Sequence, residues 1–278
     1  MTFPLPLREG GDAESEAILK ILALGDVVGR PGREIIAEVL PDLITEQDVS
    51  FVLTNAENAA GGSGLTPETV NVLFAAGVDC ITTGDHVFRR KEIIPLLETD
   101  GRILRPANFP KTASGKGFTV LKARQGERVG VVNVLGRIFM KPIDDPFAAV
   151  DAALNKLAGE TDVIIVDVHA EATSEKVAMG WHLDGRVTAL VGTHTHVQTA
   201  DERVLPKGTA YITDLGMTGP HESVLGRDVQ KVLRAITTGM PTHFDVATGD
   251  VRLCGVLITA DRNTHKASAI ERIVLKTG

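Results

Sequence analysis

The sequence predicts an α/β fold, with a β-sheet core layered with helices, and three observations support this. Short apolar runs of strand length alternate with longer segments whose apolar residues repeat at helical spacing. Several of these runs end in glycine and polar residues, which indicates strands that stop at one edge of a sheet. The 278 residues are 43% hydrophobic and 23% charged, as is typical of a globular protein.

The first strand–helix unit follows residues 1–17, which lack periodicity and which we interpret as a flexible leader. Ala17–Leu24 is a compact apolar run, and Asp26 comes directly after it. Beyond Pro31, apolar residues recur at helical spacing up to Ile44. The carboxylate of Asp26 is therefore expected at the carboxyl end of a strand.

Two further units repeat this arrangement. The strand-like run Ser50–Thr54 leads into Asn55-Ala56-Glu57-Asn58 and a glycine-rich loop, after which Thr66 is expected to cap a helix. Val78–Thr83 is the next strand, and it ends in Gly84-Asp85-His86. Three strand ends thus present polar residues to the same edge.

The remaining elements complete one domain over residues 18–278, since neither a linker nor a repeat is visible. We expect strands at Gly117–Ala123 and Val129–Leu135 (an antiparallel pair), Asp162–Val168, Arg203–Leu205 and Ala210–Thr213 (a hairpin), Val251–Thr259 and Ser268–Leu275. We expect helices at Arg89–Leu97, Pro146–Leu157, from Glu171 onward, and at Arg227–Thr237.

Two histidines stand together after the apolar run Val187–Val191, in the segment Gly192-Thr193-His194-Thr195-His196. In extended backbone, residues two apart point to the same side, so both imidazoles can face one pocket. Imidazole is the commonest metal ligand at neutral pH. The alternative is a pair of solvated loop histidines.

The strand ends together predict a metal site, because ligands of open α/β sheets bind beyond the carboxyl ends of the strands. Alone, each residue has a structural explanation, such as a helix cap for Asp26 or a hydrogen-bonded core histidine for His169. Imidazole and carboxylate groups without a thiolate suit manganese, iron or zinc. There are more such groups than one ion needs, so we expect two metals that share a carboxylate. The candidates are Asp26, Glu57, Asn58, Asp85, His86, His169, His194 and His196.

Charge and cysteine content restrict the partners. A formal net charge of -7 argues against broad binding to double-stranded nucleic acid or an anionic membrane. A small phosphorylated substrate is still allowed, because bound cations can reverse the local sign. Cys80 and Cys254 lie in apolar runs without a preceding secretory signal, so we expect buried free thiols in a cytoplasmic protein. No apolar segment approaches the roughly 20 residues that cross a bilayer.

The order of these motifs resembles that of the calcineurin-like metallophosphoesterases. Four phrases resemble the bacterial YmdB family more closely, and the likeness covers nearly everything after Lys20. They are Gly25-Asp26-Val27-Val28-Gly29, Glu57-Asn58-Ala59-Ala60-Gly61-Gly62, Arg105-Pro106-Ala107-Asn108 and Asp214-Leu215-Gly216-Met217-Thr218-Gly219-Pro220. The resemblance implies the calcineurin-like metallophosphoesterase fold and a dinuclear phosphodiesterase of cyclic nucleotides, including 2′,3′-cyclic ones. It also implies two transition-metal ions, iron or manganese, and allows a homo-oligomer.

The resemblance further implies a role for each site residue. Asp26, Asn58 and His196 would hold the first metal. Asp85, His169 and His194 would hold the second, with Glu57 bridging the two. His86 would donate a proton to the leaving oxygen, as a positioned general acid can.

One ligand departs from the family pattern, since its usual Gly-Asn-His is Gly84-Asp85-His86 here. The additional negative charge should hold the second metal more tightly and weaken it as a Lewis acid. It should also raise the pKa of the adjacent His86. We therefore expect a working but altered site.

Several other residues are weaker candidates. His221 lies in Gly219-Pro220-His221-Glu222-Ser223, which we expect to be a polar loop that could cover the pocket and touch substrate. Gly61-Gly62-Ser63-Gly64 lacks the lysine and the spacing of a P-loop. Arg89-Arg90-Lys91 is expected at a solvated helix start, where a phosphate contact is allowed. His182, His243 and His265 lack the strand-end context.

Two other functions remain as alternatives. An amidohydrolase also uses a His-x-His pair, but there the pair comes from the first strand and the lone aspartate comes late, the reverse of the order here. A regulatory protein could retain the metal site to bind a nucleotide without turnover. Asp85 favours that view, whereas His86 opposes it, since binding alone needs no proton donor.

Overall fold

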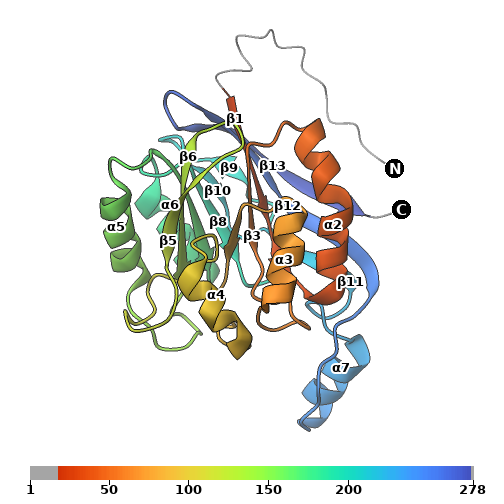
Figure 1. Ribbon diagram of the computed structural model, residues 1–278. Helices are drawn as coiled ribbons and strands as arrows, with labels where there is room; N and C mark the ends of the chain where they lie inside the picture. The colour runs from red at the N-terminus through yellow and green to blue at the C-terminus, as the bar shows by residue number, and fades with distance from the viewer. Residues whose placement is uncertain (1–17, 277–278) are drawn as a thin grey trace.

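Two β-sheets lie face to face in the computed structural model, and helices cover both outer faces (Figure 1). The structure describes residues 18–276, so the expected leader, residues 1–17, lies outside the described residues. The predicted α/β class is confirmed. Within 18–276, no helix is both long and apolar enough to span a bilayer.

The first sheet has seven strands, in the order β2-β11-β12-β1-β3-β4 with β13 paired to β12. Strands β1, β3 and β4 are parallel neighbours, so their carboxyl ends lie at one edge. The strands are β1 (Ile18–Leu24), β2 (Asp26–Val27), β3 (Phe51–Asn55), β4 (Cys80–Thr82), β11 (Met217–Glu222), β12 (Gly249–Asp261) and β13 (Ala267–Lys276).

The second sheet has six strands in the order β5-β6-β7-β8-β10-β9. Strands β6, β7 and β8 are parallel, while β5–β6 and β9–β10 form the two antiparallel pairs that the sequence predicted. The strands are β5 (Phe118–Lys122), β6 (Arg128–Leu135), β7 (Val163–His169), β8 (Ala189–Thr193), β9 (Arg203–Val204) and β10 (Ala210–Ile212).

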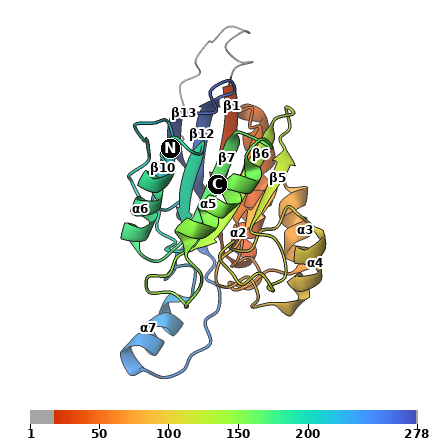
Figure 2. The same cartoon turned by 90° about the vertical axis from the view of Figure 1, so that its left-hand side faces the viewer.

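Three apolar clusters make the core. One lies between the sheets and joins fully buried residues of both, such as Ile21, Val131 and Ile165. A second joins the first sheet to α2, α3 and α4, and a third joins the second sheet to α5 and α6. Helix α7 projects from the body (Figure 2). The helices are α2 (Gly29–Glu46), α3 (Pro67–Ala75), η1 (Lys91–Ile93, a 3-10 turn), α4 (Ile94–Thr99), α5 (Pro146–Leu157), α6 (Thr173–Leu183) and α7 (Val229–Thr238).

Local signals set several helix ends. The Thr66 hydroxyl accepts a hydrogen bond from Thr69 N at 3.3 Å, so the predicted cap of α3 is confirmed. The helix expected over Arg89–Leu97 is wrong in its first half, where only a 3-10 turn forms. The α-helix starts at Ile94 because Pro95, which lacks an N–H, fits the first turn of a helix and not its interior.

The segment expected as a polar loop, Gly219–Ser223, is mostly strand. Met217–Glu222 forms β11, which pairs with β12 and, in parallel, with β2. Gly219 and Pro220 favour a turn locally, but pairing with two neighbouring strands overrides that preference. Because Met217 stands opposite Asp26 in this register, β11 helps to fix the Asp26 backbone.

Candidate metal centre

Four candidate ligands converge where the two sheets meet. Glu57 follows β3 and Asp85 follows β4, whereas His169 ends β7 and His194 follows β8. One ligand atom from each lies within 4.8 Å of the others, so this cluster could hold a metal ion. Glu57 Oε1 is 3.1 Å from His169 Nε2, which in turn is 3.1 Å from His194 Nδ1.

Three more candidates lie beside this cluster. His196 Nε2 is 3.2 Å from the Asn58 amide nitrogen and 3.7 Å from Asp26 Oδ1. Asp26 is completely buried and its Oδ2 accepts a hydrogen bond from His194 N at 3.1 Å. The structure therefore brings all seven predicted ligands together, in two adjoining groups joined through Glu57-Asn58 and the His-x-His segment.

The backbone of the His-x-His segment differs from our expectation. His194 and His196 have φ values of 96° and 63°, so the segment is not extended. Both rings still face the centre, because two left-handed residues bend the chain after β8. Such conformations are unfavourable for non-glycine residues and persist only where the surroundings enforce them.

Each candidate imidazole has an oxygen acceptor on the ring nitrogen that points away from the centre. His169 Nδ1 is 2.9 Å from the Thr193 hydroxyl, which donates to Asp167 Oδ1 at 2.7 Å. His194 Nε2 is 3.2 Å from Glu171 Oε2. His196 Nδ1 is 3.1 Å from the carbonyl oxygen of Leu225. Acceptors of this kind fix the tautomer that leaves the other nitrogen free to bind a metal.

These acceptors and Asn55 contact the candidate ligands, and none of them was predicted from the sequence. The Asn55 side-chain nitrogen donates to Asp167 Oδ2 at 3.2 Å and lies 3.1 Å from His169 Nδ1. The available signal was position in the chain, since Asn55 stands two residues before Glu57 and Glu171 two residues after His169. Glu171 reaches His194 because α6 begins at Thr173, two residues later than expected.

Two unpartnered carboxylate oxygens support a cationic occupant. Asp26 Oδ1 and Asp85 Oδ1 are buried and have no hydrogen-bond partner. A buried anionic oxygen without a donor is costly unless a cation balances it. Gly84 also leaves the space that the ligands occupy, since a Cβ there would lie 2.2 Å from His169 Nε2 and 2.6 Å from Glu57 Oε2. The residues present therefore fit a metal centre.

The pKa shifts describe how the charges balance among the ligands. Burial raises the pKa of Asp26 to about 6. Burial opposes charge on His169, but the adjacent Glu57 carboxylate raises its pKa well above the usual value. Burial and the positive charge on His169 lower the pKa of His194 to about 4. Burial opposes charge on Asp85, yet His169, whose Nε2 is 3.8 Å from Asp85 Oδ1, and the charges of the other nearby histidines hold the pKa of Asp85 below the ordinary range.

His86 lies against the ligands and is held at two points. Its backbone N–H donates to Glu57 Oε2 at 2.8 Å, and its ring Nδ1 lies 2.8 Å from Asn58 Oδ1. Its side chain is 27% exposed, which leaves the ring accessible from solvent. His86 Nε2 is 3.7 Å from Asp85 Oδ2, at the solvent side of the second group.

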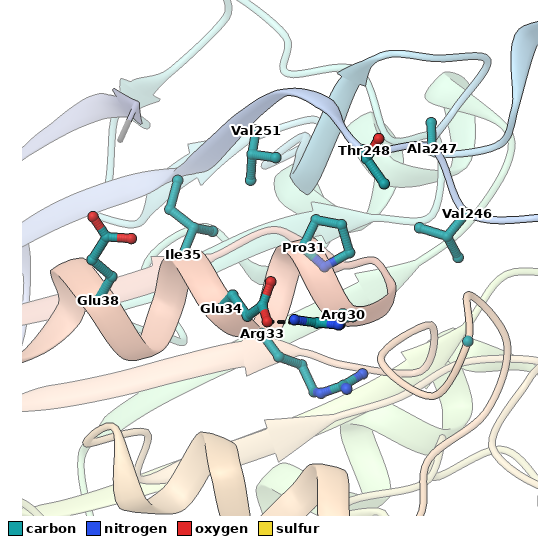
Figure 3. Close-up of a pocket in the computed structure, with 11 residues that line it drawn as sticks. Arg30, Pro31, Arg33, Glu34, Ile35, Glu38, Val246, Ala247, Thr248 and Val251 are labelled. Atoms are coloured by element: carbon teal, nitrogen blue, oxygen red, sulfur yellow. Dashed lines mark hydrogen bonds and ion pairs between the residues drawn. The ribbon is translucent and has the colours of Figure 1, made fainter. Parts of the chain in front are cut away.

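The weaker candidates lie apart. His221 is half-buried on β11, where its hydrogen bonds in the described structure go to Gly219 O and Cys254 Sγ. Arg90 packs beside Gly64 in the loop that follows Glu57. A cavity of about 640 Å³ borders this loop at Gly61 and the start of α2, but none of the candidate ligands lines it (Figure 3).

Comparison with known proteins identifies the family. The chain matches the family described as YmdB-like protein over residues 22–273. It belongs to the YmdB-like family. It is 49% identical over 257 residues to the 2′,3′-cyclic-nucleotide 2′-phosphodiesterase of Bacillus subtilis strain 168, covering 92% of this chain and 97% of that relative.

Two solved structures agree with this YmdB-like assignment. A hypothetical protein from Thermus thermophilus has 42% identity and a TM-score of 0.86, over 94% of this chain and 100% of that one. A novel phosphatase from Mycoplasma pneumoniae has 36% identity and a TM-score of 0.87, over 93% and 94%. The metallophosphoesterase fold implied by the YmdB resemblance is confirmed.

Proposed function

We propose that this YmdB-like chain is a metal-dependent phosphodiesterase that uses two metal ions. The observation that carries the proposal is the convergence of carboxylates and correctly oriented imidazoles around Asp26 Oδ1 and Asp85 Oδ1, two buried oxygens without a donor. Each orphan oxygen belongs to a different ligand group. Two ions would balance the negative charge of both carboxylates. A single ion would leave either Asp26 or Asp85 without a cation.

The ligands divide between the two ions by proximity. Asp26, Asn58 and His196 would hold the first ion, in line with the 3.7 Å and 3.2 Å separations of His196 from its partners. Asp85, His169 and His194 would hold the second. Glu57, whose Oε1 is 3.1 Å from His169 Nε2 and which directly precedes Asn58 in the chain, would bridge the two ions. Nitrogen and oxygen ligands without thiolate suit manganese, iron or zinc, and the family resemblance favours iron or manganese among them.

The residues around the ions suit hydrolysis of a phosphate ester. Two bound cations would neutralise phosphate oxygens and lower the pKa of a water molecule. The 2.8 Å contact with Asn58 Oδ1 orients His86 so that Nδ1 donates and Nε2 faces outward. A protonated His86 can then give its Nε2 proton to the ester oxygen that leaves as water adds to phosphorus.

The proposed substrate class is cyclic nucleotides, including 2′,3′-cyclic ones. Support comes from the 49% identity to a relative of that name over nearly the whole of both chains. A cytoplasmic location and a homo-oligomer remain predictions. Both cysteines are buried and free, in line with a reducing compartment.

A rate comparison tests the proposed function. Hydrolysis of a 2′,3′-cyclic nucleotide, a linear diester and a monoester would be measured with native protein and with His86→Ala. We expect the cyclic diester to be fastest and His86→Ala to lower its kcat roughly 10²-fold or more, with metal content retained. A faster monoester rate would refute the substrate class, and a metal-loaded protein without turnover would favour a binding role instead.

A further inference from the structure

A second cavity, of about 950 Å³, lies on the far side of the six-stranded sheet from the first sheet. It is bounded by edge strand β5, by α5 and by the loop between Arg105 and Gly117. Its lining includes Phe118, alanine residues of α5, and Phe109, whose ring also packs edge to face against Phe88 with 5.8 Å between the ring centroids. None of the candidate metal ligands lines it. Its volume is at the upper end of the range for small-molecule sites.

The cavity is lined by cations that lack carboxylate partners. Within residues 18–276, Arg105, Lys111, Lys116 and Lys156 form no ion pair. Two of the three carboxylates in the lining are already engaged, since Asp145 lies 3.7 Å from Arg137 and Glu160 pairs with Arg128. The free charge in this cavity is therefore positive, in a chain whose net charge is -7.

The main support for a ligand in this cavity is Arg105, a buried cation whose described hydrogen bonds go only to carbonyl oxygens. Arg105 is only 7% exposed. Its Nη1 donates to the carbonyl oxygen of Pro106 at 2.7 Å, and its Nε donates to the carbonyl oxygen of Ala113 at 3.4 Å. These two bonds fix the guanidinium but supply no negative charge, and burial lowers its pKa. A buried guanidinium without an anion is unfavourable, and its planar donors suit a phosphate.

We propose that this cavity binds an organic phosphate of nucleoside-monophosphate size, at a site separate from the metal centre. The phosphate would contact Arg105 and the lysines at the rim. Phe118 and the alanine side of α5 would accept the planar base, in the way that nucleotide sites combine cationic and aromatic groups. Binding here does not depend on the proposed hydrolysis.

The cavity is joined to the metal centre by one short segment. Asn108, in the cavity wall, donates to Leu135 O at 2.7 Å and accepts from Leu135 N at 2.8 Å. The next residue, Gly136, donates its N–H to His169 O at 2.9 Å. An occupant of the cavity would therefore lie against Asn108, whose two hydrogen bonds hold the end of β6 beside His169, a candidate ligand.

Photo-crosslinking locates the site directly. The metal-loaded protein would be irradiated with 8-azido-AMP, with and without excess AMP, and the adducts mapped by mass spectrometry. We expect adducts on peptides within residues 105–120 or 144–160 that excess AMP abolishes and excess adenosine does not. Adducts confined to metal-centre peptides, no competed adduct, or equal protection by adenosine would each overturn the proposal.

Charge-reversal variants supply the second measurement, because replacing buried Arg105 risks misfolding. Lys116→Glu/Lys156→Glu alters exposed rim residues, and Lys207→Glu/Lys266→Glu is a matched control at exposed lysines outside the cavity. We expect the rim variant to weaken AMP binding at this site roughly tenfold or more. Equal affinity in both double variants would refute the role of the cavity cations.

Discussion

At the residue scale, Gly84 lets the backbone approach the proposed metal ligands His169 and Glu57 closely. Gly84→Ala would place a Cβ 2.1 Å from His169 Cδ2 and 2.6 Å from Glu57 Oε2, so one ligand must move. We expect loss of about one metal ion per chain and a kcat lowered roughly 10²-fold, because small misplacements near the chemistry are costly. Metal analysis and initial rates would measure both.

A matched variant separates this effect from a general cost of the added methyl group. Gly101→Ala places its Cβ 3.7 Å from the nearest atom, which is ordinary contact. It should retain native metal content and rate. If Gly84→Ala also retains both, the assigned positions of His169 and Glu57 are wrong.

The departure at Asp85 gives a second prediction at this scale. Asp85→Asn removes a negative charge from a group whose Oδ1 is buried without a donor. We expect weaker retention of the second metal during dialysis against a chelator and a change in kcat, since an amide leaves the ion a stronger Lewis acid. Unchanged retention together with an unchanged rate would show that this charge does not matter.

The pKa of Asp26 predicts a pH dependence of the metal-free protein. Its folded pKa of about 6 lies above the ordinary value of 3.8. Its contribution to stability is therefore fully present below about pH 4 and lost as pH rises through about 6. His194, whose pKa falls to about 4, contributes in the opposite sense, because its stabilisation is present above about pH 6.5 and lost on acidification.

Comparison with Asp26→Asn isolates the aspartate contribution. A rise in pKa from 3.8 to about 6 corresponds to about 3 kcal/mol. Urea unfolding of both metal-free proteins from pH 4 to pH 7 should show native protein losing stability relative to the variant by about this amount. A stability difference that is constant with pH would contradict the raised pKa.

At the scale of elements, a buried ion pair holds the His-x-His segment. Lys176 of α6 donates to Asp214 Oδ2 at 2.7 Å, and both side chains are buried. The same oxygen accepts from Thr195 N and from the Thr195 hydroxyl, between the two histidines. The pair therefore connects α6 to the strained bend that aims both rings.

Removing one member of this pair should disturb both stability and the site. We expect Lys176→Met to destabilise the protein by about 3 kcal/mol or more, because an unpaired buried carboxylate remains. Metal retention should also fall, because Asp214 would no longer be fixed. Urea unfolding and metal analysis would check this, with Lys266→Met as an exposed control; native-like values would show that Thr195 does not depend on the pair.

At the scale of the whole molecule, the sequence predicted which residues stand at the strand ends better than it predicted how the strands are arranged in two sheets. Apolar runs followed by Asp26, Glu57 or Asp85 were sufficient to place these candidate ligands at one edge, because strand length and side-chain chemistry are local properties. The division into two sheets was not predicted. Glu57 and His169 come from different sheets, and their contact depends on packing across the core.

The residues that hydrogen-bond to the candidate ligands could not be predicted from the sequence for the same reason. Asn55, Asp167 and Thr193 stand on three strands and become one hydrogen-bond network only when the sheets pack face to face. The positive φ values of His194 and His196 also arise from tertiary contacts, because neither residue type demands them. A turn-rich phrase such as Gly219-Pro220 became strand through pairing that no local signal reveals.

The central claim is that two metal ions lie in this centre, the first on His196 and the second on His194. Metal content per chain, measured by mass spectrometry on native protein, His194→Ala and His196→Ala, tests it most directly. We predict two ions in native protein and about one in each variant, with anomalous diffraction placing the remaining ion beside Asp26 in His194→Ala and beside Asp85 in His196→Ala. Native protein without stoichiometric metal would contradict the account.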